Sequence, residues 1–402
     1  MATTVSLAKR MTPISACILL CMTLGLLCQG VASQDPYAPV CERGKYPPAE
    51  SLKVPEYVIN LDLPARDRWT QLATEKRQEI RNILKGFKSF VDQFGGFAEE
   101  IVYFIDLFGP AIVDFLPQPF QDEIRGISKA TGLEIGEVTL YNIFYEIFTV
   151  CTSIIAEDAN GTVYHARNLD FGLFMGWDAK NRTWQMTEIL KPAIVNLDFQ
   201  KNGKTVFKSV NYAGYVGILT GIVPGKFSLT INERFKLDGG YMGIIHLIMT
   251  GKGSWLGFLT RNAMETAQSF EEAMALLVNT ELIAPAYYIL GGNSSGQACV
   301  ITRNREVNGT DVWWMKQAGG WYVLETNYDH WSAPLFLDDR RTPANNCMRK
   351  LTQQNVGVAG LFDVLSSKPV LNKLTTYTAL MQVNSGHLET WLQSCPDPCV
   401  PW

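Results

Sequence analysis

The strongest constraint on the fold is a change of pattern at Cys151, where helical spacing of apolar residues gives way to short apolar runs. The runs 151–157 and 162–168 are separated by Asp-Ala-Asn-Gly at 158–161. Asn-Gly between two apolar runs is the strongest short-range signal of a β-hairpin. A lone hairpin is at best marginally stable in water, so these two strands are predicted to belong to a larger sheet.

The two sides of Cys151 differ in predicted secondary structure. Before it, the Pro-rich stretch 34–64 ends in a strand-like run at 57–61, and apolar residues spaced by threes and fours then predict helices. These helices are expected at 67–94, 97–108 and 135–148. After it, strands are expected at 185–199, 204–212, 215–219, 227–232, 286–290, 298–302, 312–315, 321–325 and 375–383, and helices at 256–266, 270–278, 346–354 and 358–366. The sequence therefore predicts an α+β protein, with a helical part at 34–150 and a mixed domain at 151–402.

The first 33 residues have the pattern of a secretory signal peptide. Lys9 and Arg10 precede an apolar run at 14–27, and the small residues Val31 and Ser33 follow it. The run is shorter than the roughly 18–20 residues that span a bilayer. Sequons for N-glycosylation begin at Asn160, Asn181, Asn293 and Asn308. Together these features predict a glycoprotein of the secretory pathway.

Charge and motifs exclude several functional classes. The formal net charge is −4, and removing Lys9 and Arg10 with the signal makes it −6. An acidic chain is not expected to bind nucleic acid. The sequence contains no His-Glu-x-x-His or paired Cys-x-x-Cys zinc motif, so neither a metal nor a cofactor is expected. No Gly-x-Ser-x-Gly elbow lies on a predicted strand-to-helix turn with its partners in the usual order, so a serine hydrolase is not expected.

Cys151 is the candidate nucleophile. Alone, a cysteine at the start of an apolar strand is better interpreted as a buried structural residue, and this is the expectation for Cys299. The predicted hairpin, however, returns Arg167 and Asp170 alongside Cys151. A neighbouring guanidinium favours the thiolate, and a carboxylate can orient an amine. The alternative for Arg167 and Asp170 is a structural ion pair at a strand end.

Five motifs in the same order resemble those of the family that contains the acid ceramidases and their close relatives, the N-acylethanolamine acid amidases. They lie at 151–158, 165–172, 232–235, 325–329 and 337–342. The resemblance covers about 41–402, which is nearly all of the chain after the signal. Three further stretches, at 171–177, 232–241 and 395–399, are similar to the ceramidases and not to the amidases.

The resemblance implies an N-terminal-nucleophile hydrolase with an αββα sandwich. In such proteins the bond before the nucleophile, here Val150–Cys151, is cut autocatalytically. The products would be a helical α subunit, 34–150, and a catalytic β subunit, 151–402, that stay associated.

The resemblance also assigns roles to residues. It implies Cys151 as nucleophile, Arg167 and Asp170 as its partners, Asn327 as the oxyanion residue, and Glu233 and Arg340 as supporting charges. It further implies two disulfide bonds, Cys41–Cys347 between the subunits and Cys395–Cys399 in a C-terminal loop.

The amine created by cleavage can act as base for its own thiol, so no histidine is required. A model α-amine has a pKa of roughly 7.7–8.0 and would be mostly protonated in an acidic compartment. We therefore expect Arg167 and partial burial to lower the pKa of this amine, or a thiolate–ammonium pair to be the resting state.

For the substrate, the resemblance implies ceramide and other N-acyl lipids, hydrolysed to sphingosine and fatty acid, with synthesis as the reverse reaction. It implies a lysosomal and also secreted protein that works at an anionic membrane surface with saposin-type lipid carriers. The aromatic residues of 67–149 could pack on the core or face lipid. Two alternatives stay open, namely an N-acylethanolamine amidase with the same site and a lipid-binding protein without catalysis.

Overall fold

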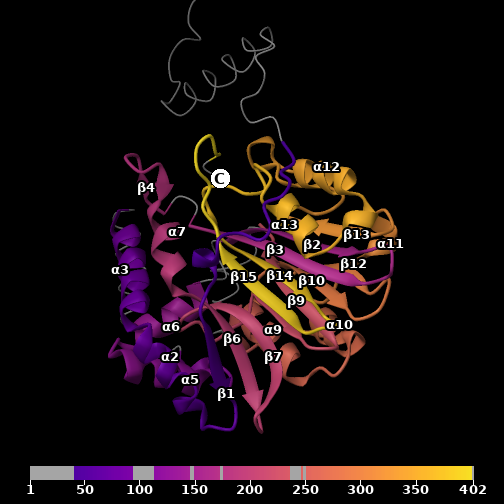
Figure 1. Ribbon diagram of the computed structural model, residues 1–402. Coiled ribbons are helices and arrows are strands. Elements are labelled where there is room, and N and C mark those ends of the chain that lie inside the picture. Colours follow the sequence, from indigo (N-terminus) through magenta and orange to yellow (C-terminus); the bar gives the residue numbers. More distant parts are fainter. Residues whose placement is uncertain are drawn as a thin grey trace, which may run out of the picture. The chain divides into compact units, whose positions relative to one another are not determined.

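Two β-sheets are the centre of the fold in the computed structural model, which describes residues 40–93, 113–144, 149–172, 175–235, 246–247 and 250–400 (Figure 1). The larger sheet has eight strands in the order β1-β6-β7-β8-β9-β10-β11-β12. Their bounds are Glu56–Asn60 (β1), Ile194–Lys201 (β6), Lys204–Tyr212 (β7), Thr220–Val223 (β8), Phe227–Glu233 (β9), Ala286–Gly292 (β10), Ala298–Arg303 (β11) and Asp311–Trp314 (β12). Strand β1 pairs with β6 in parallel, and the other neighbours are antiparallel.

The smaller sheet has five strands in the order β13-β2-β3-β14-β15, all antiparallel. Their bounds are Tyr322–Glu325 (β13), Thr149–Glu157 (β2), Val163–Phe171 (β3), Thr375–Gln382 (β14) and His387–Leu392 (β15). A separate two-stranded ribbon joins Trp177–Asp178 (β4) to Thr183–Trp184 (β5). The predicted hairpin is confirmed as β2 and β3, in which Cys151 lies opposite Leu169.

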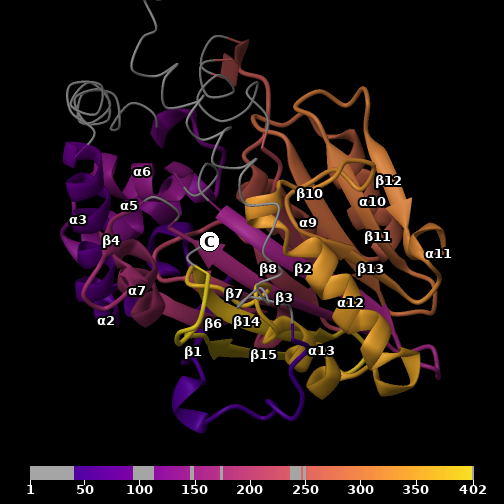
Figure 2. The same cartoon turned by 90° about the horizontal axis from the view of Figure 1, so that it is seen from above.

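Helices cover the outer faces of both sheets, so the layer order is αββα (Figure 2). Helices α9 (Leu256–Thr266) and α10 (Phe270–Asn279) pack on the larger sheet, and α12 (Arg341–Leu351) and α13 (Val358–Leu365) pack on the smaller one. Strands β2 and β3 contact β9 and β10 across the layer between the sheets. This is the N-terminal-nucleophile hydrolase architecture that the resemblance implied.

The N-terminal helices gather beside α7 (Gln185–Leu190), near the edge of the larger sheet (Figure 1). They are α2 (Thr70–Glu75), α3 (Arg77–Gln93), α5 (Phe120–Thr131) and α6 (Ile135–Phe144). The short elements are α11 (Met315–Ala318) and the 3-10 helices η1 (Glu50–Leu52), η2 (Ala65–Asp67), η3 (Val113–Phe115), η5 (Lys191–Ala193), η6 (Phe336–Asp338) and η7 (Gln353–Asn355). Within the described ranges, no helix combines the length and the apolar character needed to cross a membrane.

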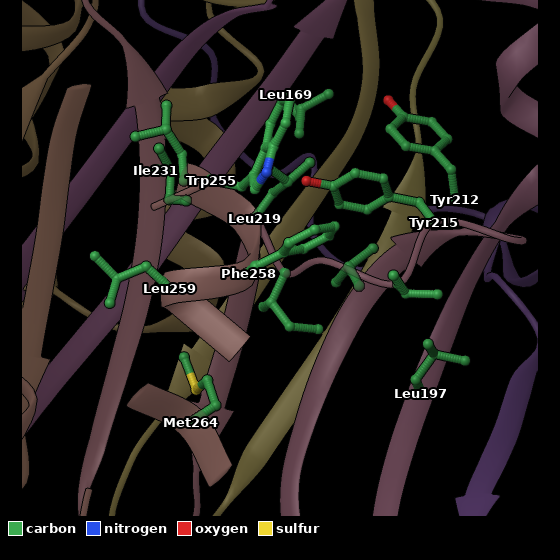
Figure 3. Close-up of a cluster of buried hydrophobic side chains, with 14 of the residues drawn as sticks. Leu169, Leu197, Tyr212, Tyr215, Leu219, Ile231, Trp255, Phe258, Leu259 and Met264 are labelled. Atoms are coloured by element: carbon green, nitrogen blue, oxygen red, sulfur yellow. The ribbon is translucent and has the colours of Figure 1, made fainter. Parts of the chain in front are cut away.

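The apolar core extends from the sheets to the helices. Figure 3 shows Phe258 of α9 beside Tyr215 and Leu219, with Leu169 of β3 in the same cluster. These four side chains are nearly completely buried. Because Leu169 is the register partner of Cys151, the core directly supports the strand pair that carries the candidate nucleophile.

Turn chemistry explains the hairpin register. The Asp158 side chain accepts hydrogen bonds from the backbone N–H groups of Asn160 and Thr162, at 2.8 and 2.9 Å. Gly161 has a φ of 85°, a conformation that glycine adopts without steric cost. These local contacts fix the loop length and hence place Arg167 opposite Ser153.

Two strand predictions are wrong. The stretch 185–199 begins as helix α7 and η5, and only then becomes β6, because Met186 and Leu190 lie one helical turn apart and are both buried. The run 215–219 is an irregular connection before β8. There the Asn211 amide donates to the carbonyls of Tyr215 and Gly217, which replaces a strand ladder.

One helical prediction has the wrong start, and two others lie wholly or partly outside the described residues. The helix expected at 346–354 is α12, which begins earlier because Asp339 accepts from the backbone N–H of Thr342 at 2.8 Å and caps its first turn. Strand β15 was not anticipated. The predicted helix 97–108 and the end of 135–148 lie outside the described residues, as does the signal segment 1–33.

The structure forms both disulfide bonds, Cys41–Cys347 and Cys395–Cys399. Cys299 is a buried free thiol, as expected. All four sequon asparagines are exposed, a location that glycan attachment requires. Of the aromatic residues of the N-terminal part whose packing was in question, Phe87 is buried against Phe171 of β3. The side chains of Phe90, Phe94, Phe97, Tyr103, Phe104 and Phe108 lie outside the described set.

Candidate active site

The Cys151 side chain is fully buried in β2, between the two sheets. Alternation along a strand puts Cys151 and Ser153 on one face, and Ser153 pairs with Arg167 on β3. Arg167 therefore projects on the same face as Cys151, and its Nη2 donates to the Cys151 sulfur. The hairpin expected from Asn160-Gly161 brings these two side chains together as predicted.

Arg167 is held in place by two further acceptors. Its Nη1 donates to the carbonyl of Leu219 at 2.7 Å and to the hydroxyl of Thr220 at 3.0 Å. Thr220 is the first residue of β8 in the opposite sheet, and Leu219 directly precedes it. The guanidinium thus bridges the two sheets and fixes a positive charge at the sulfur, a geometry that a flexible lysine would not reproduce.

Asp170 lies opposite Val150 in the same hairpin and is also fully buried. Its carboxylate accepts from the Thr375 hydroxyl at 2.6 Å and the Asn372 amide at 3.1 Å, and Nη1 of Arg340 lies 3.5 Å away. The sequence suggested that Asp170 could orient the amine of Cys151. In the structure the charged group nearest to the Asp170 carboxylate is instead the Arg340 guanidinium.

Arg340 directly precedes α12 and contacts the backbone of the candidate nucleophile. Its Nη1 donates to the carbonyl of Cys151 at 2.6 Å, and its Nη2 donates to Oδ1 of Asn327 at 2.7 Å. Its Nε donates to Asp338 at 2.9 Å. Arg340 therefore links the carbonyl side of Cys151 to the predicted oxyanion residue.

Asn327 lies in the turn that follows β13. Its Oδ1 accepts from the backbone N–H of Cys151 at 2.9 Å, and its Nδ2 donates to the carbonyl of Glu233 at 2.7 Å. Nδ2 carries two N–H groups, so a second one is available to a developing oxyanion. The resemblance implied that the charged side chain of Glu233 supports the site. In the structure it is the main-chain carbonyl of Glu233 that contacts Asn327.

Burial dominates the electrostatics of the site. Burial raises the pKa of the Cys151 thiol, and the Arg167 guanidinium is the largest opposing effect. Burial also raises the pKa of Asp170 to about 6, although Arg340 and two hydrogen bonds act against it. At Cys299 burial raises the pKa of the thiol to about 12. Of the two free thiols described, Cys151 therefore has the chemical setting of a nucleophile.

Three contributing residues were not predicted from the sequence. Asn372 and Thr375 hold Asp170, and Asp338 holds Arg340. Asp338 lies two residues before Arg340 in the motif at 337–342, and this spacing could have identified it. No sequence signal distinguished Asn372 or Thr375, because their role depends on how β14 pairs with β3.

Comparisons with known proteins agree with this geometry. Residues 151–391 match the linear amide C–N hydrolases of the choloylglycine hydrolase family, and residues 53–116 match the β subunit of N-acylethanolamine-hydrolyzing acid amidase. The family match begins at Cys151 itself.

Individual relatives are also similar over nearly their full length. Acid ceramidase of Heterocephalus glaber is 48% identical over 95% of this chain and 97% of that protein, and acid ceramidase of Homo sapiens is 48% identical over 97% of this chain and 100% of that protein. Among solved structures, the Caenorhabditis elegans N-acylethanolamine-hydrolyzing acid amidase ortholog is 30% identical with a TM-score of 0.51, covering 61% of this chain and 100% of that chain.

Proposed function

Because the chain belongs to the acid ceramidase family of linear amide C–N hydrolases, we propose that this amidohydrolase cleaves the amide bond of ceramide, with Cys151 as an N-terminal nucleophile made by self-cleavage. One observation carries the proposal. The sulfur, the nitrogen and the carbonyl of Cys151 each have a dedicated partner, namely Arg167, Asn327 and Arg340. A structural cysteine has no need of such a set.

Processing would begin in the uncut chain, where Val150 and Cys151 are consecutive residues of β2. The Cys151 sulfur attacks the carbonyl carbon of Val150, the C–N bond breaks, and the acyl group moves from nitrogen to sulfur. Water then hydrolyses the thioester, which frees the Val150 carboxylate and the Cys151 amine. The two fragments would remain joined by the Cys41–Cys347 disulfide.

The freed amine would take the proton of its own thiol. Asn327, whose Oδ1 already accepts from this nitrogen in the uncut chain, would orient it. The thiolate, beside Arg167, attacks the carbonyl carbon of the substrate amide. A tetrahedral oxyanion forms, and Nδ2 of Asn327 donates to it.

Collapse of this intermediate breaks the C–N bond, and the protonated Cys151 amine returns its proton to the leaving nitrogen. Sphingosine departs, and a thioester of the fatty acid stays on Cys151. Water, deprotonated by the same amine, hydrolyses the thioester and releases the fatty acid. The same steps in reverse would synthesise ceramide when concentrations and pH favour it.

We place this reaction in the lysosome and in the secreted pool, at an anionic membrane surface with saposin-type carriers presenting the lipid. The exposed sequon asparagines Asn160, Asn181, Asn293 and Asn308 are proposed to carry glycans. The buried carboxyls Asp170 and Glu325, with their pKa values raised to about 6 and about 8, suit an acidic compartment.

A second candidate substrate is an N-acylethanolamine. It is supported by the match of residues 53–116 to the N-acylethanolamine-hydrolyzing acid amidase and by the nematode structure. The same site would perform that chemistry, because only the leaving amine differs.

One experiment tests class and substrate together. Purified protein is incubated at acid pH, separated by reducing denaturing electrophoresis, and the larger fragment is sequenced from its N-terminus. We expect it to begin at Cys151. The processed protein is then given N-lauroylsphingosine and N-palmitoylethanolamine in parallel, and faster release of fatty acid from the former is expected. An uncut chain that binds lipid without hydrolysis would contradict the proposal.

A further inference from the structure

Asn232, near the end of β9, is fully buried and contacts both halves of the catalytic site. Its Oδ1 accepts from the Ser153 hydroxyl at 2.9 Å. Its Nδ2 donates to the carbonyls of Glu325 and Thr326, at 3.1 and 2.7 Å. Ser153 lies two residues after Cys151, and Thr326 directly precedes Asn327.

Both the oxygen and the nitrogen of the Asn232 amide therefore make hydrogen bonds. Nδ2 has two hydrogens and two carbonyl acceptors, and Oδ1 has a hydroxyl donor. Burying a primary amide between two sheets is costly unless its hydrogen bonds are made, and an apolar side chain of similar shape would avoid that cost. The presence of an amide here therefore indicates that it serves to join the strand at Ser153 to the turn at Glu325 and Thr326.

A buried polar row fixes the orientation of this amide. Because Ser153 donates to Asn232, it accepts from the Thr230 hydroxyl, at 2.9 Å. Thr230 in turn lies 3.1 Å from Nε2 of His165, and Nδ1 of His165 lies 2.9 Å from the Ser228 hydroxyl. Burial, aided by Arg167, lowers the pKa of His165 to about 3, so the row stays uncharged in the working pH range.

We propose that Asn232 is a positioning residue for the hydrolytic reaction. It ties the strand of the Cys151 nucleophile to the turn that carries Asn327, and so sets the distance between the attacking sulfur and the oxyanion donor. This inference rests on the proposed role of Asn327. Misplacement of a donor by about 1 Å typically costs on the order of 10²-fold in rate, so a tie of this kind acts on turnover more than on binding.

Asn232→Leu removes both ends of the tie at similar volume. We expect kcat to fall about 10- to 100-fold while KM stays within about threefold. The matched control is Ser228→Ala, which removes a hydroxyl from the far end of the same row, against His165. It is expected to lower the melting temperature with kcat within about twofold of the wild type.

Asn232→Asp supplies a pH readout that a purely structural role would not move. When protonated, the new carboxyl can donate one hydrogen bond to the Glu325 or Thr326 carbonyl, and when ionised it can donate none. The ratio of its kcat to that of the wild type should therefore fall as pH rises, whereas the ratio for Asn232→Leu should stay flat.

All rates are measured on protein that has been cut before Cys151. They are divided by the concentration of N-terminal cysteine that reacts with an alkylating reagent. The substrates are a soluble fluorogenic N-acyl amide and N-lauroylsphingosine. Should Asn232→Leu fail to self-cleave, Ser153→Ala is measured instead. It removes one of the three hydrogen bonds of the Asn232 amide, together with the bond from Thr230, and is expected to lower kcat a few-fold. A normal kcat in the variants that mature, or an equal loss in Ser228→Ala, overturns the positioning role.

Failure of the proposed function gives a different pattern. If Asn327→Ala has the same kcat as the wild type, Asn327 is not the oxyanion donor. The hydrogen bonds of Asn232 then have no catalytic role. If the soluble amide is hydrolysed and ceramide is not, the substrate is wrong and the positioning role of Asn232 stands.

Discussion

The backbone N–H of Cys151 donates to Oδ1 of Asn327 at 2.9 Å, although 176 positions separate the two residues in the chain. Self-cleavage would turn this N–H into the free amine that serves as base. The residue that orients the base would then also stabilise the oxyanion through its Nδ2. The hydrogen bond that would orient the base is thus already formed in the full-length chain.

Cys151→Ala is expected to abolish both processing and hydrolysis, because in the proposed mechanism one sulfur acts on the Val150 carbonyl and on the substrate. The variant should run as one uncut band on reducing gels and release no fatty acid. Cys299→Ala is the matched control, since it removes the other buried free thiol. It should be cut normally. Cleavage of the Cys151→Ala chain at the same bond would refute the shared nucleophile.

Asn327→Ala should lower kcat by about 10²–10³, the usual loss for one oxyanion donor, with little change in KM. Steady-state kinetics on the fraction that has been cut would measure both constants. Asn355→Ala, at an exposed position on η7, is expected to leave both unchanged. If only KM moves in Asn327→Ala, the oxyanion role is wrong.

Arg167→Lys tests the electrostatic role of the guanidinium. A lysine cannot hold the sulfur, the Leu219 carbonyl and the Thr220 hydroxyl in one plane. The positive charge beside the Cys151 amine would then be held less firmly in place. The pKa of that amine would therefore rise. We expect the acidic limb of the kcat/KM profile to move up by about one pH unit. An unmoved limb would show that Arg167 does not tune the amine.

Glu325 makes folding stability depend on pH. Burial raises its pKa from 4.5 to about 8, despite the nearby Arg341. The folded state then binds the proton more tightly than the unfolded chain, so this stabilisation is complete below about pH 4.5 and is lost as pH rises through about 8. Asp170 contributes in the same direction between 3.8 and about 6.

Glu325→Gln, a neutral mimic of the protonated side chain, should remove this dependence. Between pH 5 and 8 the wild type should lose on the order of 3 kcal/mol of unfolding free energy relative to the variant, measured by urea denaturation. Glu389→Gln is the control, because the pKa of Glu389 is shifted in the opposite direction. Despite burial, His387 and Tyr46 lower the pKa of Glu389, so its removal should not flatten the profile. Parallel curves for wild type and Glu325→Gln would contradict the argument.

A buried ion pair joins α5, which precedes Cys151 in the chain, to α9, which follows it. Glu123 accepts from Arg261, from the Trp69 indole at 2.8 Å and from Arg68 at 3.1 Å. Glu123→Ala leaves the buried Arg261 with the carboxylate of Glu265, which accepts from its Nε at 2.7 Å. The loss of the buried carboxylate is expected to cost on the order of 3 kcal/mol.

The neighbouring pair offers a matched comparison. Asp122 binds Arg66 with side chains 28% and 65% exposed, so Asp122→Ala should cost at most about 1 kcal/mol. Both variants are compared by urea unfolding in the Cys151→Ala background, where the chain stays uncut. Equal losses for the two would show that the buried pair does not hold the parts together.

Local signals carried the prediction of the hairpin. Asn160-Gly161 determined the turn, and alternation along the strands then put Arg167 on the face of Cys151. The same kind of reasoning failed at 185–199, where apolar residues lie on both sides of Pro192. A helix and a strand have similar composition there, and only packing of Met186 and Leu190 against the rest of the protein selects the helix.

The sequence alone determined the α+β class and the candidate nucleophile, because turn residues and apolar periodicity act over a few positions. With the motif resemblance it also named Asn327 and Arg340. Tertiary structure decided how these residues meet. Asp170 turns to Arg340 through the pairing of β14 with β3, and Asn232 ties Ser153 to the turn before Asn327. These contacts join segments that are far apart in the chain, and that of Asn232 with Ser153 also crosses from one sheet to the other. No local pattern in the chain encodes such pairings.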